Sequence, residues 1–258
     1  MDAPLLLTRD VELAIVTLNR PEKLNAIPRA LWPELAATLN ILAADDGVRC
    51  VILRGAGGNF GAGADIAEFP AVRAGSAQAR EYGALMHAAL RAVAECRHPT
   101  VALIEGACVG AGLELASSCD LRIASASSRF GVPIARIGVT MAFPELEALV
   151  GVAGRAAALA LLLEGRVFDA AEALRLGLVT RVVPDEQVEA EALACARRVA
   201  AGAPLVHRWH KQAARRLRDP APLGEAECDA AYATFDSNDF REGVESFLSK
   251  RPPLFGGR

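Results

Sequence analysis

The spacing of apolar residues along the first part of the chain predicts a hairpin followed by a helix. Residues 5–8 and 11–19 are two apolar segments separated by Arg9-Asp10, which is typical of a β-hairpin. Residues 28–43 then carry leucine at positions 31, 35, 39 and 42, a spacing that places these leucines on one face of a helix. The chain is therefore expected to begin as strand, strand and helix.

A short apolar run at residues 50–54 predicts a buried strand after this helix. The order strand, helix, strand favours parallel pairing, because a parallel crossover needs a long connection such as a helix. The remaining body is predicted to contain a helix at 76–96, strands at 100–109, 121–125 and 178–183, an irregular stretch at 130–138, helical pieces at 144–150 and 156–163, and a short helix with Asp169 as its N-cap and Gly177 as its C-cap. These elements predict an α/β fold.

The last quarter of the chain has a different pattern. From Asp185 onward almost everything is predicted to be helical, with breaks at 202–204, 219–222 and 237–238. We therefore place a boundary near residue 200, with an α/β body at 1–200 and a helical region at 201–258. That region is too small to hide all its apolar side chains, so it should pack on the body or on another subunit. The side chains concerned are Trp209, Leu217, Tyr232, Phe235, Phe240 and Phe247.

Composition narrows the class of protein without identifying it. The chain has 258 residues, 52% of them hydrophobic and 23% charged, with a formal net charge of -3. These values exclude a disordered tail and do not indicate a nucleic-acid binder. The partners are expected to be small molecules and further copies of the chain.

The cysteines and the terminal residues indicate a compartment. The six cysteines contain no CxxC pair, and several lie in apolar surroundings, which predicts buried thiols in a reducing environment. The opening MDAPLLLTRD has no basic region leading into a long apolar stretch, so no secretory signal is expected. The apolar run 156–163 is shorter than the roughly 20 residues that cross a bilayer. We expect a soluble cytoplasmic protein without a membrane partner.

A glycine-rich loop follows the strand at 50–54. Residues 55–65 read GAGGNFGAGAD, which permits positive φ angles and a close backbone approach to a ligand. A phosphate-binding P-loop would end in Gly-Lys-Ser/Thr, and no lysine is present. A dinucleotide fingerprint starting at Gly61 would need glycine at Ile66, and one starting at Gly110 would need it at Leu115. These two nucleotide motifs are therefore excluded.

A second glycine turn lies within residues 105–120, EGACVGAGLELASSCD. Gly110 and Gly112 join a predicted strand to a helix, and the N–H groups at a helix N-terminus suit an anion. Glu114 lies in the first turn of that helix among Leu113 and Leu115. Its apolar neighbours predict partial burial, which makes a carboxylate a better base, although a glutamate there can also simply favour the helix dipole.

One histidine lies beside the apolar stripe of the predicted helix 76–96. The stripe consists of Tyr82, Leu85, Met86, Ala89, Leu90 and Val93 at helical spacing. A histidine beside such a stripe is more often packed or surface-exposed than a ligand. We therefore assign His87 no functional role from the sequence.

Six motifs in order and spacing resemble the crotonase superfamily, which is the enoyl-CoA hydratase/isomerase family. They are Asn19-Arg20-Pro21 with Asn25-Ala26, GAGADI from Gly61 to Ile66, GACVGAGLELASSCDLRIA, RFGVPIARIG, EGRVFDAAEALRLGLVTRVVP, and DFREGVESFLSKR near the end. Together they cover essentially the whole chain. Six motifs in register make a chance similarity improbable.

The resemblance implies a fold and a chemistry. It implies a spiral of ββα units followed by a helical trimerisation region, assembled as a homotrimer or a dimer of trimers. It also implies an acyl-CoA thioester whose enolate oxygen is held by two backbone N–H groups, which by motif position are those of Ala64 and Ala111. Coenzyme A is then part of the substrate, and the family chemistry needs no separate cofactor or metal.

The catalytic carboxylates are where the sequence departs from the resemblance. Glu114 matches the first of two glutamates that family hydratases use to add water across a double bond. The second falls on Ile134, which cannot move a proton. Glu145 or Glu147 could supply this acid from another position, although solvation on a helix surface is the role we expect for each.

The missing glutamate leaves several functions open. The leading interpretation is an enoyl-CoA hydratase, which adds water to a 2-enoyl-CoA. The first alternative is an enoyl-CoA isomerase or another enzyme that uses one carboxylate, and the second is an acyl-CoA-binding protein with little turnover. The aspartate nucleophile of family dehalogenases would fall near Ala142, which disfavours that chemistry.

The resemblance also implies residues that contact the substrate. Lys23 lies in a loop that runs near the nucleotide in relatives, and Phe247 with Lys250 match a pair that reaches the CoA of a neighbouring subunit. Basic and aromatic side chains suit phosphates and adenine. The other expected binding residues are Ala62, Asp65, Ile66, Gly110 and Ile134, and Asp65 can also be a turn or cap residue. The apolar residues Ile66, Phe69, Val72, Ile134, Met141 and Phe143 predict an apolar acyl pocket.

Overall fold

The structure, a computed structural model, describes residues 3–258, and its N-terminal hairpin forms one edge of a six-stranded sheet. In sheet order the strands are β1 (Leu5–Asp10), β2 (Leu13–Leu18), β3 (Cys50–Gly55), β4 (Thr100–Ile104), β6 (Leu121–Ser125) and β9 (Arg181–Val183). β1 and β2 pair antiparallel, and every later neighbour pairs in parallel. The predicted hairpin and the parallel pairing of the third strand are confirmed.

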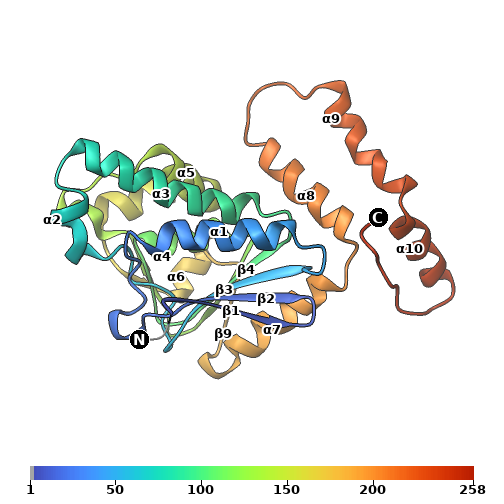
Figure 1. Ribbon diagram of the computed structural model, residues 1–258, viewed down its shortest axis with the longest axis horizontal. Helices are drawn as coiled ribbons and strands as arrows, with labels where there is room; N and C mark the ends of the chain where they lie inside the picture. The colour runs from blue at the N-terminus through green and yellow to red at the C-terminus, as the bar shows by residue number, and fades with distance from the viewer. Residues whose placement is uncertain (1–2) are drawn as a thin grey trace.

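Helices cover both faces of this sheet (Figure 1). On one face, α1 (Leu31–Ala44) packs against α3 (Ser76–Glu95), and on the other lies α7 (Val188–Ala200). The period-2 alternation of strand side chains explains both layers, since Val51 and Leu53 join the core under α1 and α3 while Cys50 and Ile52 join the core under α7. The leucine face predicted for α1 is confirmed as buried.

A second, smaller sheet redirects the chain toward the glycine turn. The prediction of one strand at 100–109 is wrong, because the chain bends at Gly106 and enters β5 (Ala107–Val109). Gly106 has φ of 49°, and a Cβ there would lie 2.3 Å from the Gly58 carbonyl oxygen. β5 pairs with β7 (Arg129–Gly131), which in turn pairs with β8 (Phe168–Asp169).

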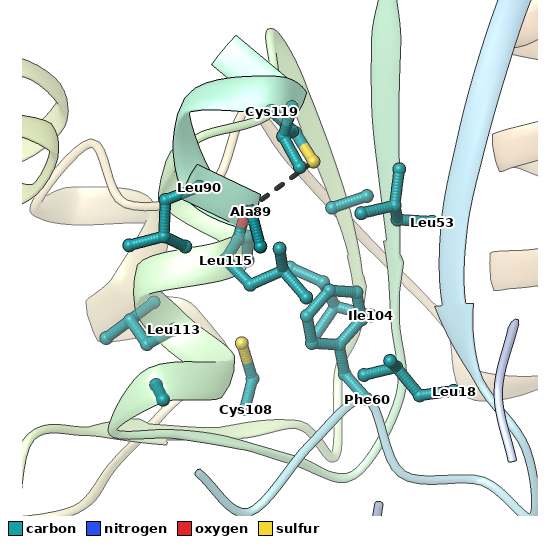
Figure 2. Packing of buried hydrophobic residues seen from close by; sticks show 14 of the residues in the cluster. Leu18, Leu53, Phe60, Ala89, Leu90, Ile104, Cys108, Leu113, Leu115 and Cys119 are labelled. Atoms are coloured by element: carbon teal, nitrogen blue, oxygen red, sulfur yellow. Dashed lines mark hydrogen bonds between the residues drawn. The ribbon is translucent and has the colours of Figure 1, made fainter. Parts of the chain in front are cut away.

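The helix that follows the glycine turn is buried throughout. α4 (Ala111–Ser117) has no exposed residue, and Figure 2 shows it packed between α3 and the main sheet. Its Leu113 and Leu115 lie near Leu90 of α3 and near Ile104 of β4. The Cys119 thiol donates to the Leu115 carbonyl at 3.7 Å, which closes the end of the helix. This burial fixes the first turn of α4 relative to the sheet.

The long helix α5 (Phe143–Glu164) replaces the two helical pieces predicted from the sequence. Its backbone is kinked at Gly154, where φ is 77° and ψ is 162°. The stretch predicted to be irregular contains β7 and the 3-10 helix Pro133–Ile137. The Asp169 N-cap of α6 (Ala170–Arg175) is confirmed, since its side chain accepts from the Glu172 N–H at 2.9 Å. Gly177, with φ of 76°, follows that helix.

By length and hydropathy, α5 is the one helix within residues 3–258 that could cross a bilayer, with a mean hydropathy of 1.8. The apolar run 156–163 predicted from the sequence was too short for this because it covers only about a third of the 22-residue helix. Length and composition alone are weak evidence for a membrane span. The exposed side chains on α5 include Phe143, Leu159 and Leu163.

The remaining short elements connect these layers. They are the 3-10 helices Pro21–Lys23, Ile66–Glu68 and Asp185–Gln187, and the short helix α2 (Phe69–Val72). Of the cysteines, five are buried as expected and Cys228 is exposed. Burial raises the pKa of the Cys119 thiol to about 12, so this thiol is not a nucleophile at neutral pH.

The C-terminal region is helical, as predicted, and projects to one side of the body (Figure 1). It contains α8 (Pro204–Arg216), α9 (Glu225–Asp229), the 3-10 helix Ala230–Asp236 and α10 (Asn238–Leu248). An ion pair of 2.7 Å between Lys211 and Asp120 fixes α8 to the body. Several apolar side chains of this region are exposed when the chain is considered alone, among them Tyr232, Phe235 and Phe247. A domain boundary at residue 200 stays a prediction.

Asn25 ties the loop after β2 to the glycine-rich loop. It is 1% exposed, with φ of 57°, and its Oδ1 accepts from the Arg20 N–H at 2.9 Å. Its Nδ2 donates to the carbonyl oxygens of Ala56 at 2.8 Å and Asn59 at 2.6 Å. One side chain therefore satisfies three backbone groups of two loops.

The substitution Asn25→Ala should lower the free energy of unfolding by about 3 kcal/mol, because it leaves buried backbone groups unpaired and puts alanine in the left-handed region. Urea denaturation would measure this loss. Asn40→Ala, on the exposed side of α1, is the matched control and should change stability by less than about 0.5 kcal/mol. Equal midpoints for the two variants would contradict the role assigned to Asn25.

Candidate active site

A cavity of about 240 Å³ lies where the glycine-rich loop meets the first turn of α4. Its wall comes from residues 62–66 of the loop, 109–114 of the turn and α4, the segment 133–141, and Glu145 at the start of α5. Phe69, Arg73 and Met86 close the remaining side. The sequence motifs that were singled out separately therefore surround one space.

Two backbone hydrogen bonds hold the loop and the turn together. The Gly61 N–H donates to the Ala107 carbonyl at 2.8 Å, and the Val109 N–H donates to the Gly61 carbonyl at 3.0 Å. Gly112 is required for this approach, because a Cβ there would lie 2.2 Å from the Gly61 carbonyl oxygen. The glycines of both motifs therefore permit contact between two backbones.

The contact between the loop and the turn leaves two backbone N–H donors at the cavity. Ala64 is flanked by the bonds from the Ile27 N–H to the Gly63 carbonyl and from the Asp65 N–H to the Ile27 carbonyl, so its own N–H points away from Ile27. Ala111 is the first residue of α4, where an N–H has no intrahelical acceptor. In the described chain neither N–H has an acceptor, and both residues line the cavity. The pair can bind an oxyanion.

Gly110 shapes the turn between these donors. It has φ of 54°, and its N–H donates to the Gly131 carbonyl at 2.8 Å. Its carbonyl accepts from the Glu114 N–H at 3.0 Å, which begins the helical ladder of α4. Gly110 therefore contributes backbone geometry to the cavity.

Glu114 is the first acid in the cavity wall. It is 6% exposed, so the burial expected from its apolar neighbours is confirmed. Its pKa is raised to about 8, chiefly by burial and also by the nearby charge of Glu145, while the Arg73 guanidinium opposes both effects. At neutral pH Glu114 is therefore protonated and can donate a proton.

Glu145 is the second acid, and the expectation that it lies on a solvated helix surface is wrong. Its side chain is 6% exposed and lines the same cavity. One carboxylate oxygen accepts from the Ala142 N–H, and the other lies 2.8 Å from His87 Nε2. Glu147 does match the expectation, since its side chain is 69% exposed and pairs with Arg218.

Two polar residues of the site were missed by sequence reasoning. His87 is packed beside the stripe, as expected, but its contact with Glu145 could not be read from the sequence because 58 residues separate them. Arg73 follows α2 in a loop with no motif, and its guanidinium stacks over Phe69 and Tyr82. No local signal in the sequence would have found these contacts.

Most of the residues that were predicted to line the pocket do so, and two do not. Ala62, Ile66, Phe69, Ile134 and Met141 line the cavity. Val72 packs on the core, and Phe143 is 87% exposed. Neither lines the cavity of the single chain, so the prediction that these two residues line the acyl pocket is wrong.

Asp65 and Glu68, which flank the loop, have structural partners. Asp65 occupies the N-cap position of the 3-10 helix Ile66–Glu68, as expected, but its side chain makes no capping hydrogen bond and instead pairs with Arg20 at 3.0 Å. A Glu68 carboxylate oxygen accepts from the Arg29 N–H at 2.7 Å. Both carboxylates hold the loop in place.

The predicted CoA residues are not gathered around the cavity of one chain. Lys23 is exposed at the end of a 3-10 helix. Phe247 is 83% exposed on α10, and Lys250 follows that helix in the chain. Neither residue lines the cavity, and Figure 1 shows α10 far from α4. Among residues 3–258 no group of three or more His, Cys, Asp or Glu side chains is arranged to hold a metal ion.

Comparison with known proteins connects this geometry to a family. Residues 8–258 match the family model described as Enoyl-CoA hydratase/isomerase. A Mycobacterium bovis protein named "Probable enoyl-CoA hydratase" is 34% identical over 257 residues, 98% of each chain. A crotonyl-CoA hydratase of Syntrophomonas wolfei is 34% identical over 254 residues, 97% of each chain. An enoyl-CoA hydratase/carnithine racemase structure from Magnetospirillum magneticum has a TM-score of 0.98 and 48% identity, covering 100% of this chain and 97% of that one.

The substitution Gly112→Ala should separate the loop from the turn, because the new Cβ would collide with backbone rather than with a flexible side chain. We expect a loss of about 2 kcal/mol or more in the free energy of unfolding, together with weaker anion binding. Urea denaturation and titration with butyryl-CoA would measure both. Gly75→Ala is the control, since nothing lies within 4 Å of its Cβ position. If Gly112→Ala had wild-type stability and binding, as Gly75→Ala is expected to have, the role assigned to the backbone contact would be contradicted.

Proposed function

Because the chain belongs to the enoyl-CoA hydratase/isomerase family, the crotonase superfamily, we propose that it hydrates a 2-enoyl-CoA to a 3-hydroxyacyl-CoA. The family and the crotonase fold implied by the sequence motifs are both confirmed. The observation that carries the reaction is the cavity in which two unpaired backbone donors lie beside two buried carboxylates, Glu114 and Glu145.

The oxyanion hole would act on the thioester carbonyl. The N–H groups of Ala64 and Ala111 donate to the carbonyl oxygen, whose negative charge grows as the enolate forms. Fixed donors of this kind each lower a barrier by about 3 kcal/mol in a site that excludes water. Because the two loops are fixed by backbone bonds, the donors need no rearrangement during the reaction.

The two carboxylates would divide the proton transfers. Glu145, which accepts a hydrogen bond from the Ala142 N–H, is the base: it takes a proton from water as the water oxygen bonds to C3. The electron pair of the double bond moves to the enolate. Glu114 then donates its proton to C2, which gives the 3-hydroxyacyl thioester. A proton passed back from Glu145 to Glu114 restores the starting state.

His87 would keep Glu145 in position for this role. A histidine N–H that donates to a carboxylate oxygen fixes the orientation of that carboxylate. Ile134 lines the cavity where relatives are expected to carry the second glutamate. Glu145 therefore supplies from α5 the carboxylate that residue 134 lacks, which favours hydration over the reactions that need one carboxylate.

Substrate binding would involve more than one subunit. Lys23 and the loop at Ala62, Asp65 and Ile66 would contact CoA from one subunit, and Phe247 with Lys250 would reach the CoA of a neighbour. The exposed apolar side chains on α5 and in the C-terminal region support assembly into a homotrimer or a dimer of trimers. We place the enzyme in the cytoplasm, in acyl-CoA metabolism such as that of fatty acids, without a separate cofactor.

Glu114→Gln and Glu145→Gln should each slow hydration of crotonyl-CoA by about 100-fold or more, because each removes one proton transfer. The loss of the conjugated enoyl absorbance measures the rate. Glu147→Gln is the matched control on α5 and should retain wild-type activity. Full activity of Glu145→Gln would show that the second acid lies elsewhere, and binding without turnover in the wild type would favour the acyl-CoA-binding alternative.

The rate of hydration should fall as pH rises through about 8, because that is where Glu114, with its pKa raised to about 8, loses the proton that it donates to C2. A raised pKa in an acid preserves the protonated form below this value, so the active form dominates at neutral pH. A profile of kcat/KM between about pH 6 and 10 would show the descending limb. A rate that instead increased through this range would make ionised Glu114 the base.

A further inference from the structure

Arg73 is a cation in the acyl part of the cavity. Its guanidinium carbon lies 4.7 Å from the centroid of the Phe69 ring and 4.8 Å from that of Tyr82. The two rings meet edge to face, with centroids 6.2 Å apart. Tyr82 is itself fixed, because it is fully buried and its hydroxyl accepts from Trp32 Nε1 at 3.0 Å. The guanidinium therefore rests on a rigid aromatic corner.

The hydrogen-bonding edge of this guanidinium has no partner in the described part of the chain. No carboxylate lies within 4.0 Å of Arg73, and its side chain donates to no backbone or side-chain acceptor between residues 3 and 258. Stacking on rings uses the faces of a guanidinium and leaves its five N–H donors free. Arg73 thus presents a planar donor edge to the cavity that it lines.

The balance of charge in the cavity wall favours an anionic guest. Four ionisable side chains line it: Arg73, Arg136, Glu114 and Glu145. Arg136 is exposed to solvent, whereas Arg73 is part-buried. Burial raises the pKa of Glu114, which reduces the negative charge that this acid can present to Arg73. An acyl chain of hydrocarbon alone, packed against Arg73, would remove water from the donors of this guanidinium without giving them acceptors.

We propose that Arg73 binds a carboxylate on the acyl group, so that the preferred substrate is an enoyl-CoA whose short acyl chain ends in a carboxylate. This proposal rests on the proposed hydration and specifies its substrate class. A planar carboxylate matches the two parallel donors of a guanidinium and forms a bidentate pair. It also gives Arg73 an anionic partner, while the apolar residues Ile66, Phe69 and Met86, which line the same cavity, would contact the methylene groups.

Binding of saturated acyl-CoA esters tests the proposal without turnover. Glutaryl-CoA and pentanoyl-CoA have acyl chains of the same length and differ in a terminal carboxylate or methyl group. Isothermal titration calorimetry should find glutaryl-CoA bound at least about 10-fold more tightly by the wild type, a preference of ordinary size for one desolvated charge pair. Arg73→Gln should abolish this preference while keeping the affinity for pentanoyl-CoA, which also shows that the variant is folded.

Two further variants sharpen the result. Arg73→Lys keeps the charge but not the fork, so it should retain part of the preference. Arg80→Gln, an exposed arginine on α3, is the matched control and should bind both esters as the wild type does. Tighter binding of pentanoyl-CoA by the wild type, or an unchanged ratio in Arg73→Gln, would overturn the proposal. Failure to hydrate any enoyl-CoA would overturn the proposed reaction alone, because the binding ratio does not depend on it.

Discussion

The contact between the Gly61 and Gly112 backbones is the constraint on which the rest of this site depends. It joins a loop that leaves the main sheet to a helix that begins at the smaller sheet, and it does so without side chains. The unpaired N–H groups of Ala64 and Ala111 then face one cavity. Because the donors belong to the backbone, alanine is sufficient at both positions. The positions that require a particular residue type are the glycines around these two alanines.

The same cavity has to hold two acids in an apolar wall, and it places them in different environments. Glu114 has no hydrogen-bond donor to its carboxylate among residues 3–258 and its pKa is raised to about 8, whereas Glu145 has the Ala142 N–H and His87 as partners. Two ionised carboxylates so close together in a buried site would repel one another strongly. Under the proposed mechanism, these separate environments suit Glu114 to donate a proton and Glu145 to accept one.

Much of this arrangement could be predicted from the sequence, because it depends on local patterns. The hairpin, the leucine face of α1, the glycine turns and the burial of Glu114 all follow from residues near one another in the chain. What could not be predicted depends on contacts across the fold. The break at Gly106 is set by a distant Gly58 carbonyl, and the burial of Glu145 is set by His87 on another helix. The sequence predicted Glu145 to lie on a solvated helix surface, because the residues around it do not show which side of α5 packs against the body.

The position of Glu145 also bears on how such proteins are compared. A carboxylate at the start of α5 and one at residue 134 occupy different columns of any sequence alignment, yet both positions line the same cavity. Under the proposed function, the second carboxylate therefore comes from a different element than residue 134 and still reaches the same space. Comparing members of this superfamily by the residue at one aligned position would overlook such a carboxylate, whereas a search for acidic side chains that line the cavity together with Ala64 and Ala111 would find it.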